Sequence, residues 1–176
     1  MPSGIGRINM TNIKTPMTKE KILQLIKGEG EYKDLNINER AKLVKSTPFA
    51  NFDFITEHLL KAFFYGAHLE NVNFTGAHLE LVNFNESYAA GAKFEAADLT
   101  KAKFVDAELP SANFKKANVQ DMDVKGANLN YADFREARNF QTIQNLEKAK
   151  NFMTVKLDSD ENKRFLERKK AESLFL

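Results

Sequence analysis

The three histidines are the residues of this sequence whose type and spacing come nearest to a metal site. His58, His68 and His78 follow one another at intervals of ten, and Glu80 lies two residues after the last of them. The imidazoles of His58 and His78, about 5 Å apart on one face with Glu80 nearby, could hold a zinc ion, because nitrogen and oxygen donors suit that metal, whereas His68 would lie on the opposite face. The simpler interpretation, which we favour, is that histidine replaces the usual polar residue of a repeat at each place.

A five-residue repeat sets this spacing and extends from Ala62 to Ala137. Each unit opens with a small residue and has a large apolar residue two places later. The large positions hold Phe64, Leu69, Phe74, Leu79, Phe84, Ala89, Phe94, Leu99, Phe104, Leu109, Phe114, Val119, Val124, Leu129 and Phe134. Neither a helix nor an ordinary strand repeats every five residues, so the chain must form a repeat architecture whose structural unit has five residues.

The units ANLNY, ADFRE, ADLTK and ANFKK resemble those of the pentapeptide-repeat family, whose unit is loosely A-(D/N)-L-x-x. The resemblance covers fifteen tandem units. It implies an all-β core, a right-handed quadrilateral β-helix in which four units make one coil of 20 residues. It transfers no catalytic residue to this chain.

The order of the large residues independently indicates 20 residues per coil. Phenylalanine and leucine alternate, so positions 20 apart should stack in columns of like residues. Coils would lie about 4.8 Å apart, as strands do in a sheet. The small positions also point inward, and their residues must be small because the rings already fill the interior. At Met122 and Val124 the large and the small residue are exchanged within one unit. The interior is therefore predicted to be a core and not a ligand pocket.

One unit, SYAAG at residues 87–91, breaks the pattern because Ala89 stands in a column of leucines. A missing leucine should leave a cavity, at a cost of about 2–5 kcal/mol by analogy with Leu→Ala changes. Tyr88 beside it is expected to fold inward or to bulge the coil. The simpler interpretation is an irregularity without function, but irregularities can re-aim side chains, so this is the first place to look for a site.

The chain divides into three parts. Residues 1–48 are predicted to form an N-terminal tail and helical cap, residues 49–138 the β-helix, and residues 139–176 a C-terminal helical cap. Residues 1–16 show no clear period. Residues 49–61 keep the period of large residues and fit either a distorted first coil or a third cap helix, so both alternatives stay open.

Two short helices are expected in the N-terminal cap. Thr18 can cap a helix through residues 19–27, and Asn36 or Asn38 can cap a second through residues 39–45. Helices at this end would cover the interior of the first coil.

The C-terminal part is predicted to hold two helices. In residues 142–152 the apolar side chains recur at intervals of three, as on one face of a helix, and Ser159 can begin another helix over 160–172. That last helix is basic enough to suggest contact with acidic lipid or nucleic acid, but its interleaved acidic residues favour an ordinary cap. The apolar tail, Leu174–Leu176, is expected to pack on the last coil, with dimerisation through it as the alternative.

The sequence predicts a protein that is not an enzyme. No nucleophile elbow, phosphate loop or HExxH motif is present. An acid–base pair needs an enclosed site with shifted pKa values, whereas the carboxylates of the repeat fall at outward positions. They include Asp98, Asp106, Glu108, Asp121, Asp123 and Asp133. We assign no catalytic, cofactor-binding or metal residues and no cofactor.

Composition limits the partners. The net charge is only +2, which does not call for nucleic acid, and no apolar run is long enough to span a membrane. Cysteine is absent, which excludes disulfides and thiolate chemistry. No classical signal peptide is recognisable, so the expected location is the cytoplasm, with export by a non-classical signal left open.

These observations favour a protein-interaction or scaffold module whose partner is another, unidentified protein. Some members of the family it resembles mimic duplex DNA and protect type II topoisomerases such as gyrase, acting as dimers, and this role is the alternative. Residues 49–138 carry thirteen acidic against nine basic side chains, a weak excess for a DNA mimic. A monomer is therefore expected.

Outward apolar residues are candidates for a contact surface. They are Phe63, Tyr65, Leu81, Val105 and Tyr131. The first two should be buried by the N-terminal cap, whereas Leu81 and Tyr131 could contribute to a contact with a partner.

Overall fold

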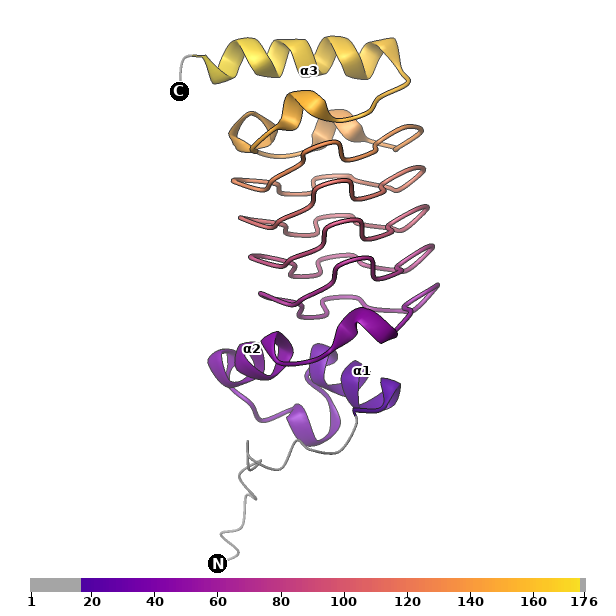
Figure 1. The fold of residues 1–176 in the computed structure, drawn as a ribbon, viewed down its shortest axis with the longest axis vertical. Coiled ribbons are helices and arrows are strands. Elements are labelled where there is room, and N and C mark those ends of the chain that lie inside the picture. Colours follow the sequence, from indigo (N-terminus) through magenta and orange to yellow (C-terminus); the bar gives the residue numbers. More distant parts are fainter. Residues whose placement is uncertain (1–16, 175–176) are drawn as a thin grey trace, which may run out of the picture.

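The computed structural model describes residues 17–174, so the expectations for residues 1–16 and for the last two residues of the tail lie outside it. The chain forms a rod of stacked coils with helices at both ends (Figure 1). None of the helices in this described part is long and apolar enough to cross a membrane.

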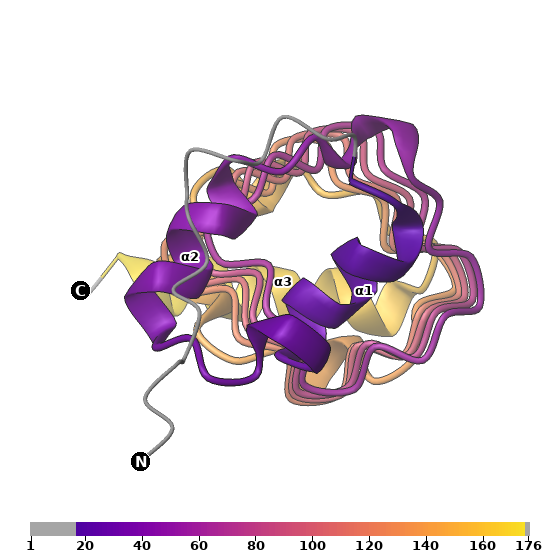
Figure 2. The ribbon, with the colours of Figure 1, turned by 90° about the horizontal axis from the view of Figure 1, so that it is seen from below.

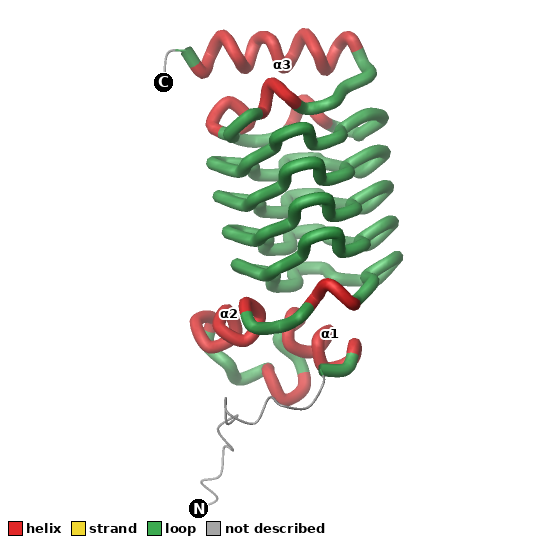
Figure 3. The backbone as a smooth tube through the Cα atoms, in the orientation of Figure 1, coloured by secondary structure: helices red, strands yellow, loops and turns green. Residues whose placement is uncertain are grey.

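Parallel backbone bridges join residues that are 20 apart, beginning with Asp53 and Asn73 and recurring every five residues as far as Asn118 and Arg138. Each coil therefore has four bridging positions, and the coils superimpose when seen along the axis (Figure 2). Every bridge is a single residue, so within the described residues the expected β core consists of isolated bridges, not extended strands, and the coils are drawn as loops (Figure 3). The predicted period of 20 residues is present.

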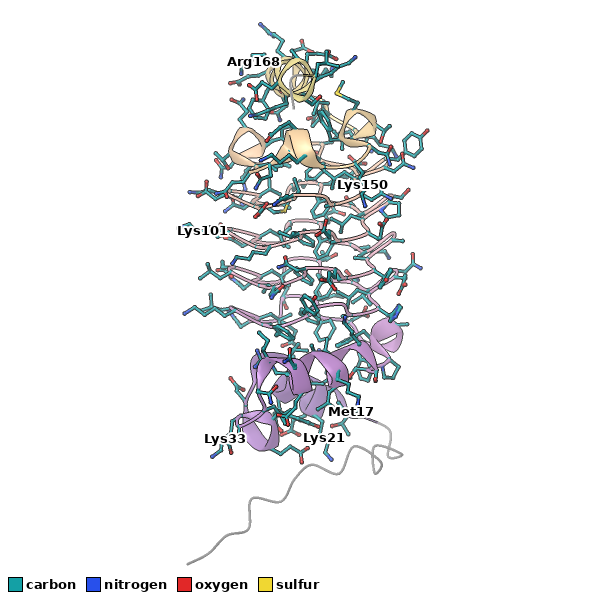
Figure 4. All side chains as sticks on the ribbon, turned by 90° about the vertical axis from the view of Figure 1, so that its left-hand side faces the viewer. Met17, Lys21, Lys33, Lys101, Lys150 and Arg168 are labelled. Carbon is teal, nitrogen blue, oxygen red and sulfur yellow. The ribbon has the colours of Figure 1, made fainter. Side chains whose placement is uncertain are left out.

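A turn follows each bridging position and makes the corner of the coil. Every fifth residue from Thr56 to Glu136 has a positive φ angle. The next residue closes the turn, as when the Ala67 N–H donates to the Phe64 carbonyl at 3.0 Å, the pattern of a turn with a left-handed third residue. Only four corners in this range are glycine: Gly66, Gly76, Gly91 and Gly126. Other corners carry side chains outward, as Lys101 does (Figure 4).

Two columns of phenylalanine fill the interior of the rod. Within a column the rings stack at centroid distances of 4.6–5.2 Å. Rings of the two columns meet edge to face at 5.5–6.0 Å. Met122 and Val124 are both fully buried, which confirms the predicted exchange of volumes within that unit.

The N-terminal cap contains the two predicted helices. Helix α1 (Lys19–Lys27) is capped by the Thr18 side chain. Helix α2 (Ile37–Lys45) is capped by Asn36, not Asn38, in a capping box that Glu39 completes. Between them lies the short 3₁₀ helix η2 (Gly30–Tyr32).

These helices cover the start of the rod, as predicted. Phe63 is 3% exposed, and its N–H donates to the carbonyl of Ile26 in α1 at 2.7 Å. The guanidinium of Arg40 in α2 lies 4.7 Å from the centre of the Phe63 ring. The first coil is therefore closed by backbone hydrogen bonding as well as by apolar contact.

Residues 49–61 form the first coil and not a third cap helix. A 3₁₀ turn, η3 (Phe49–Asn51), leads into it, and Asp53 begins the ladder of bridges. Phe54 and Leu59 are fully buried in the core, as the period of large residues required.

The helix predicted for residues 142–152 is wrong. The chain instead makes one more turn of the rod with units of six residues, in which Gln144, Lys150 and Lys156 bridge back to the preceding coil. Each unit contains a 3₁₀ turn: η4 (Phe140–Thr142), η5 (Leu146–Lys148) and η6 (Phe152–Thr154). An asparagine with positive φ opens each unit, at positions 139, 145 and 151, and interrupts any helix. Apolar residues three apart suit both arrangements, so spacing alone misled the prediction.

Helix α3 (Asp160–Ser173) begins after Ser159 as predicted and lies across the end of this last coil, which is built from six-residue units (Figure 1). Its Leu166 is buried, and the ring of Phe165 meets that of Phe140 edge to face at 6.2 Å. Its Lys169 lies 3.7 Å from the Glu147 carboxylate. The helix is thus fastened as a cap by apolar and ionic contacts.

Candidate functional site

The unit that contains Tyr88 leaves the coil regular. Tyr88 is 47% exposed and bridges His68 on one side and Glu108 on the other. The Ala89 N–H donates to the Glu108 carbonyl at 2.7 Å, as in the other coils. The expectation that Tyr88 folds inward or bulges the coil is therefore wrong. The backbone hydrogen bonds to the neighbouring coils hold this unit in the regular conformation even though a small residue, Ala89, occupies the inner position.

The irregularity of this unit lies inside the rod. Ala89 is fully buried between Leu69 and Leu109, which occupy its position in the neighbouring coils. Ser87 replaces the usual alanine, and its buried hydroxyl has no hydrogen-bond partner among the described residues. Two bonds of 2.7 Å, from the Leu69 N–H to the Tyr88 carbonyl and from the Ala89 N–H to the Glu108 carbonyl, keep these coils at their ordinary separation.

Ala89→Leu is expected to raise the free energy of unfolding by about 2 kcal/mol, because the coils cannot close the space that the short side chain leaves. The matched change Leu109→Ala should lower it by about 2–5 kcal/mol. Urea denaturation followed by circular dichroism measures both. A loss of stability in Ala89→Leu would mean that neighbouring side chains already fill the space.

Outside the same unit, the surface has a hollow of about 380 Å³. It runs along one edge of the rod, where a column of corner residues meets a column of bridging residues, and the end of α2 closes one side. Its lining consists of Lys45, Gly66, His68, Glu86, Tyr88, Asp106 and Glu108. We call it the Tyr88 hollow.

An aromatic pair forms one wall of the Tyr88 hollow. The rings of His68 and Tyr88 stack at 4.9 Å with 8° between their planes. Because His68 and Glu108 pair with Tyr88 from the coils on its two sides, the other face of the Tyr88 ring is turned toward Glu108. The His68 Nδ1 lies 3.3 Å from Oε1 of Glu70.

The charges of the Tyr88 hollow are mainly negative. The Nζ of Lys45 lies 3.8 Å from Glu86 Oε2 and 4.8 Å from the centre of the Tyr65 ring. The hydrogen bonding and charge of Glu86 raise the pKa of Tyr65. Within the described residues, no basic side chain lies within 4.0 Å of Asp106 or Glu108, and Glu108 accepts a hydrogen bond from Asn128 at 2.7 Å. The lining of the Tyr88 hollow therefore contains one lysine and three carboxylates, and the lysine is paired with Glu86.

The histidines do not form the zinc arrangement. His58 and His78 stack at 4.4 Å with 14° between their planes, and Glu80 lies 3.7 Å from His78. Lone pairs of an imidazole lie in the plane of the ring, so stacked rings do not direct them at one ion. Over residues 17–174 no group of three or more His, Cys, Asp or Glu side chains is placed to hold a metal. His68 belongs to another column and joins the Tyr88 hollow instead.

Of the outward carboxylates named from the sequence, Asp106 and Glu108 come together in the Tyr88 hollow, whereas Asp98 and Asp133 make separate structural contacts. Partial burial raises the pKa of Asp98, but hydrogen bonds from Thr100 and Asn118 outweigh it and hold that pKa below its usual range. Hydrogen bonds and charge from Arg135 hold the pKa of Asp133 low. A general acid needs a raised pKa, so these two residues are suited to structure rather than proton transfer.

Among the predicted contact residues, Leu81 and Tyr131 are exposed, Tyr131 by 56%, and Val105 is half-buried. Ile55 and Leu60 of the first coil are also exposed and were not predicted. The sequence singled out the unit of Tyr88 but did not group it with the other residues that line the Tyr88 hollow. The signal that could have found part of this group is the 20-residue spacing of His68, Tyr88 and Glu108.

Comparison with known proteins agrees with the repeat. The family model "Pentapeptide repeats (8 copies)" matches residues 62–100, 77–115 and 92–130. No curated protein matches the sequence.

Several solved structures are similar. A crystal structure of alr5209, a pentapeptide repeat protein from Nostoc PCC 7120, is 27% identical, covers 60% of this chain and 84% of that chain, and has a TM-score of 0.51. Rfr23 from the cyanobacterium Cyanothece 51142 is 23% identical over 56% of this chain and 62% of that chain, with a TM-score of 0.42. QnrB1, a plasmid-mediated fluoroquinolone resistance protein, is 19% identical over 66% of this chain and 82% of that chain, with a TM-score of 0.35.

Proposed function

The chain is a pentapeptide-repeat protein, and from this premise we propose that it is a non-enzymatic module that binds another protein through the outer faces of its rod. We take the coil to be right-handed, the hand that parallel connections adopt. The filled interior carries the proposal: the phenylalanine, leucine and alanine columns leave chemistry and binding to the outer surface.

Two surface features support a binding role. The coils present rigid faces whose polar side chains change from coil to coil, and Figure 4 shows them projecting along the whole rod. Exposed apolar residues such as Leu81 and Tyr131 interrupt these faces. A rigid surface loses little conformational entropy when it binds, which favours specific contacts.

The test is affinity capture with a matched scaffold. The immobilised protein and the Nostoc protein alr5209, which is similar in fold but 27% identical, are exposed to the same lysate of the source cells. We expect a protein that this chain retains, that excess soluble chain displaces, and that alr5209 does not retain. Retention of the same proteins by both rods, or of none, would contradict a specific interaction role.

The alternative is protection of a type II topoisomerase, and it requires a dimer. Our proposal predicts a monomer by light scattering and an unchanged supercoiling activity of gyrase with a quinolone present. A dimer that shields gyrase, and that becomes a monomer when residues 174–176 are removed, would favour the alternative. A cytoplasmic location also stays a prediction.

A further inference from the structure

Three exposed apolar side chains lie on two adjacent corners at the N-terminal end of the rod. Ile55 and Leu60 belong to the first coil, at the corners on either side of the bridging residue His58. Leu81 lies at the same corner as Leu60, one coil further along the rod. The three side chains are between 44% and 56% exposed, and we call them the Leu60 patch.

The same positions in the later coils carry polar side chains. The column of Ile55 continues with Thr75, Glu95, Lys115 and Arg135. The column of Leu60 continues with Glu80, Thr100 and Gln120, and Leu81 lies between Lys61 and Lys101 in its own column. The apolar residues are therefore confined to the end of the rod on which α1 packs. Apolar residues gathered in one place mark a contact surface more often than single ones do.

The chain enters the described structure beside the Leu60 patch. Lys19, the first residue of α1, pairs with Glu57 at 2.6 Å between Nζ and Oε1. Glu57 stands between Ile55 and Leu60 in the sequence of the first coil. Met17 lies at the base of the rod (Figure 4). Whatever precedes Met17 therefore starts within about one lysine side chain of the patch.

Residues 1–16, which lie outside the described structure, have apolar side chains to place on such a surface. These are Ile5, Ile8, Met10 and Ile13. An extended chain advances about 3.3 Å per residue, whereas neighbouring coils lie about 4.8 Å apart. A few residues are therefore enough to pass from the start of α1 to the level of Leu81, and sixteen residues leave ample length.

The charges on this face permit the contact but do not dominate it. Residues 1–16 contain Arg7 and Lys14 and no acidic residue. Glu80 offers them a carboxylate that is 31% exposed, with His78 at 3.7 Å. The exposed Lys61 offsets this attraction, so burial of apolar surface should supply most of the free energy.

We propose that residues 1–16 lie along this face of the rod and cover the Leu60 patch with their own apolar side chains. This segment is the occupant because its attachment to α1 gives it a high effective concentration at the patch, which a separate partner lacks. The contact goes beyond the function proposed above and does not depend on it. A partner that binds another face of the rod leaves the contact intact.

The test is paramagnetic broadening in nuclear magnetic resonance spectra of the full chain. Because the sequence has no cysteine, Asn9→Cys carries a nitroxide label at a single place, between Ile8 and Met10. We expect amide peaks of residues 55–61 and 78–81 to lose intensity. Residues 88–91, ten residues further along the coil and on the opposite face, should keep theirs. Broadening of α1 and α2 without residues 78–81 would show a segment that is not held on the patch, and would refute the proposal.

Two variants of the labelled chain connect the broadening to the patch. The double variant Leu60→Ser/Leu81→Ser should restore the lost intensity, and the fold should persist because both side chains are exposed. Tyr131→Ser is the matched control, because it removes an exposed aromatic side chain from another corner and should leave the broadening unchanged. Melting curves followed by circular dichroism check that each variant is folded. Undiminished broadening in the folded double variant would contradict the assignment.

A mixture of two samples shows which molecule supplies the segment. Nitroxide-labelled chain without isotope is mixed with isotope-labelled chain without nitroxide. We expect no broadening of residues 55–61 in this mixture, whereas broadening there would assign the patch to a second copy and overturn our proposal. The outcome is separate from that of the affinity capture: if no partner is captured while the segment covers the patch, the proposed function fails and this inference stands.

Discussion

Phe104→Ala is expected to lower the free energy of unfolding by about 3–5 kcal/mol, among the largest losses that one substitution causes. Phe104 is fully buried, stacks on Phe84 at 4.7 Å, and meets Phe94 and Phe114 edge to face at 5.6 and 6.0 Å. The backbone ladder fixes the coil spacing, so the neighbours cannot move in to fill the space. The change removes both the burial and three aromatic contacts.

The measurement is urea denaturation of the wild type and the variant, followed by far-ultraviolet circular dichroism. Coincidence with a second probe, tyrosine fluorescence, shows whether unfolding is two-state, which long stacks of repeats do not always obey. Tyr131→Ala, an exposed aromatic truncation, should change stability by less than about 0.5 kcal/mol. A loss below about 1 kcal/mol at Phe104 would mean that the coils do collapse around a missing ring.

The repeat was predictable because its period is unlike that of any helix or strand. Residues that alternate every ten positions, such as Phe64, Phe74 and Phe84, specify both which side chains point inward and which of them stack. The same logic identified the inner volume exchange at Met122 and Val124. These features follow from close packing, which acts on residue size and can therefore be read from residue type.

The end of the rod was not predictable from apolar spacing. Ile143, Leu146 and Ala149 are three apart, which suits a helical face as well as a coil of six-residue units. The distinguishing signal was asparagine at every sixth position, a residue that tolerates the left-handed conformation. Backbone conformation, not burial, decided between the two.

The Tyr88 hollow depended on three-dimensional detail that a pattern only partly encodes. The spacing of His68, Tyr88 and Glu108 by 20 residues places them in one column, which the sequence does indicate. What it does not indicate is that Lys45 of the cap reaches across Gly66 to neutralise Glu86. The position of the cap relative to the coil sets the balance of charge.

Replacing Asn139, Asn145 and Asn151 together with alanine is expected to destabilise the coil of six-residue units by roughly 5–10 kcal/mol. Each has a φ angle near +60°, which alanine adopts only at a cost of about 1–2 kcal/mol. Each also donates from Nδ2 to the preceding coil: to Asn118 at 2.8 Å, to Asp123 at 2.8 Å and to Asn128 at 3.0 Å. Bonds of this kind contribute about 0.5–1.5 kcal/mol apiece.

The loss should be local, because neighbouring repeats depend mainly on one another. Amide hydrogen exchange should accelerate over residues 140–156 and α3 while the earlier coils stay protected. Detachment of this coil would free the N–H groups of Asp121 and Tyr131, which now donate to the hydroxyls of Thr142 and Thr154 at 2.9 Å. Unpaired edges of this sort pair with other chains, so light scattering should show association.

The corresponding triple glycine variant separates the two contributions. Glycine takes the left-handed conformation without strain but cannot donate the side-chain hydrogen bond. The glycine variant should therefore lose only the free energy of the three side-chain hydrogen bonds, roughly half of the alanine effect, and its last coil should stay attached. If the glycine variant exchanged as fast as the alanine variant, the hydrogen bonds to the preceding coil, and not the left-handed corners, would be what holds the end of the rod closed.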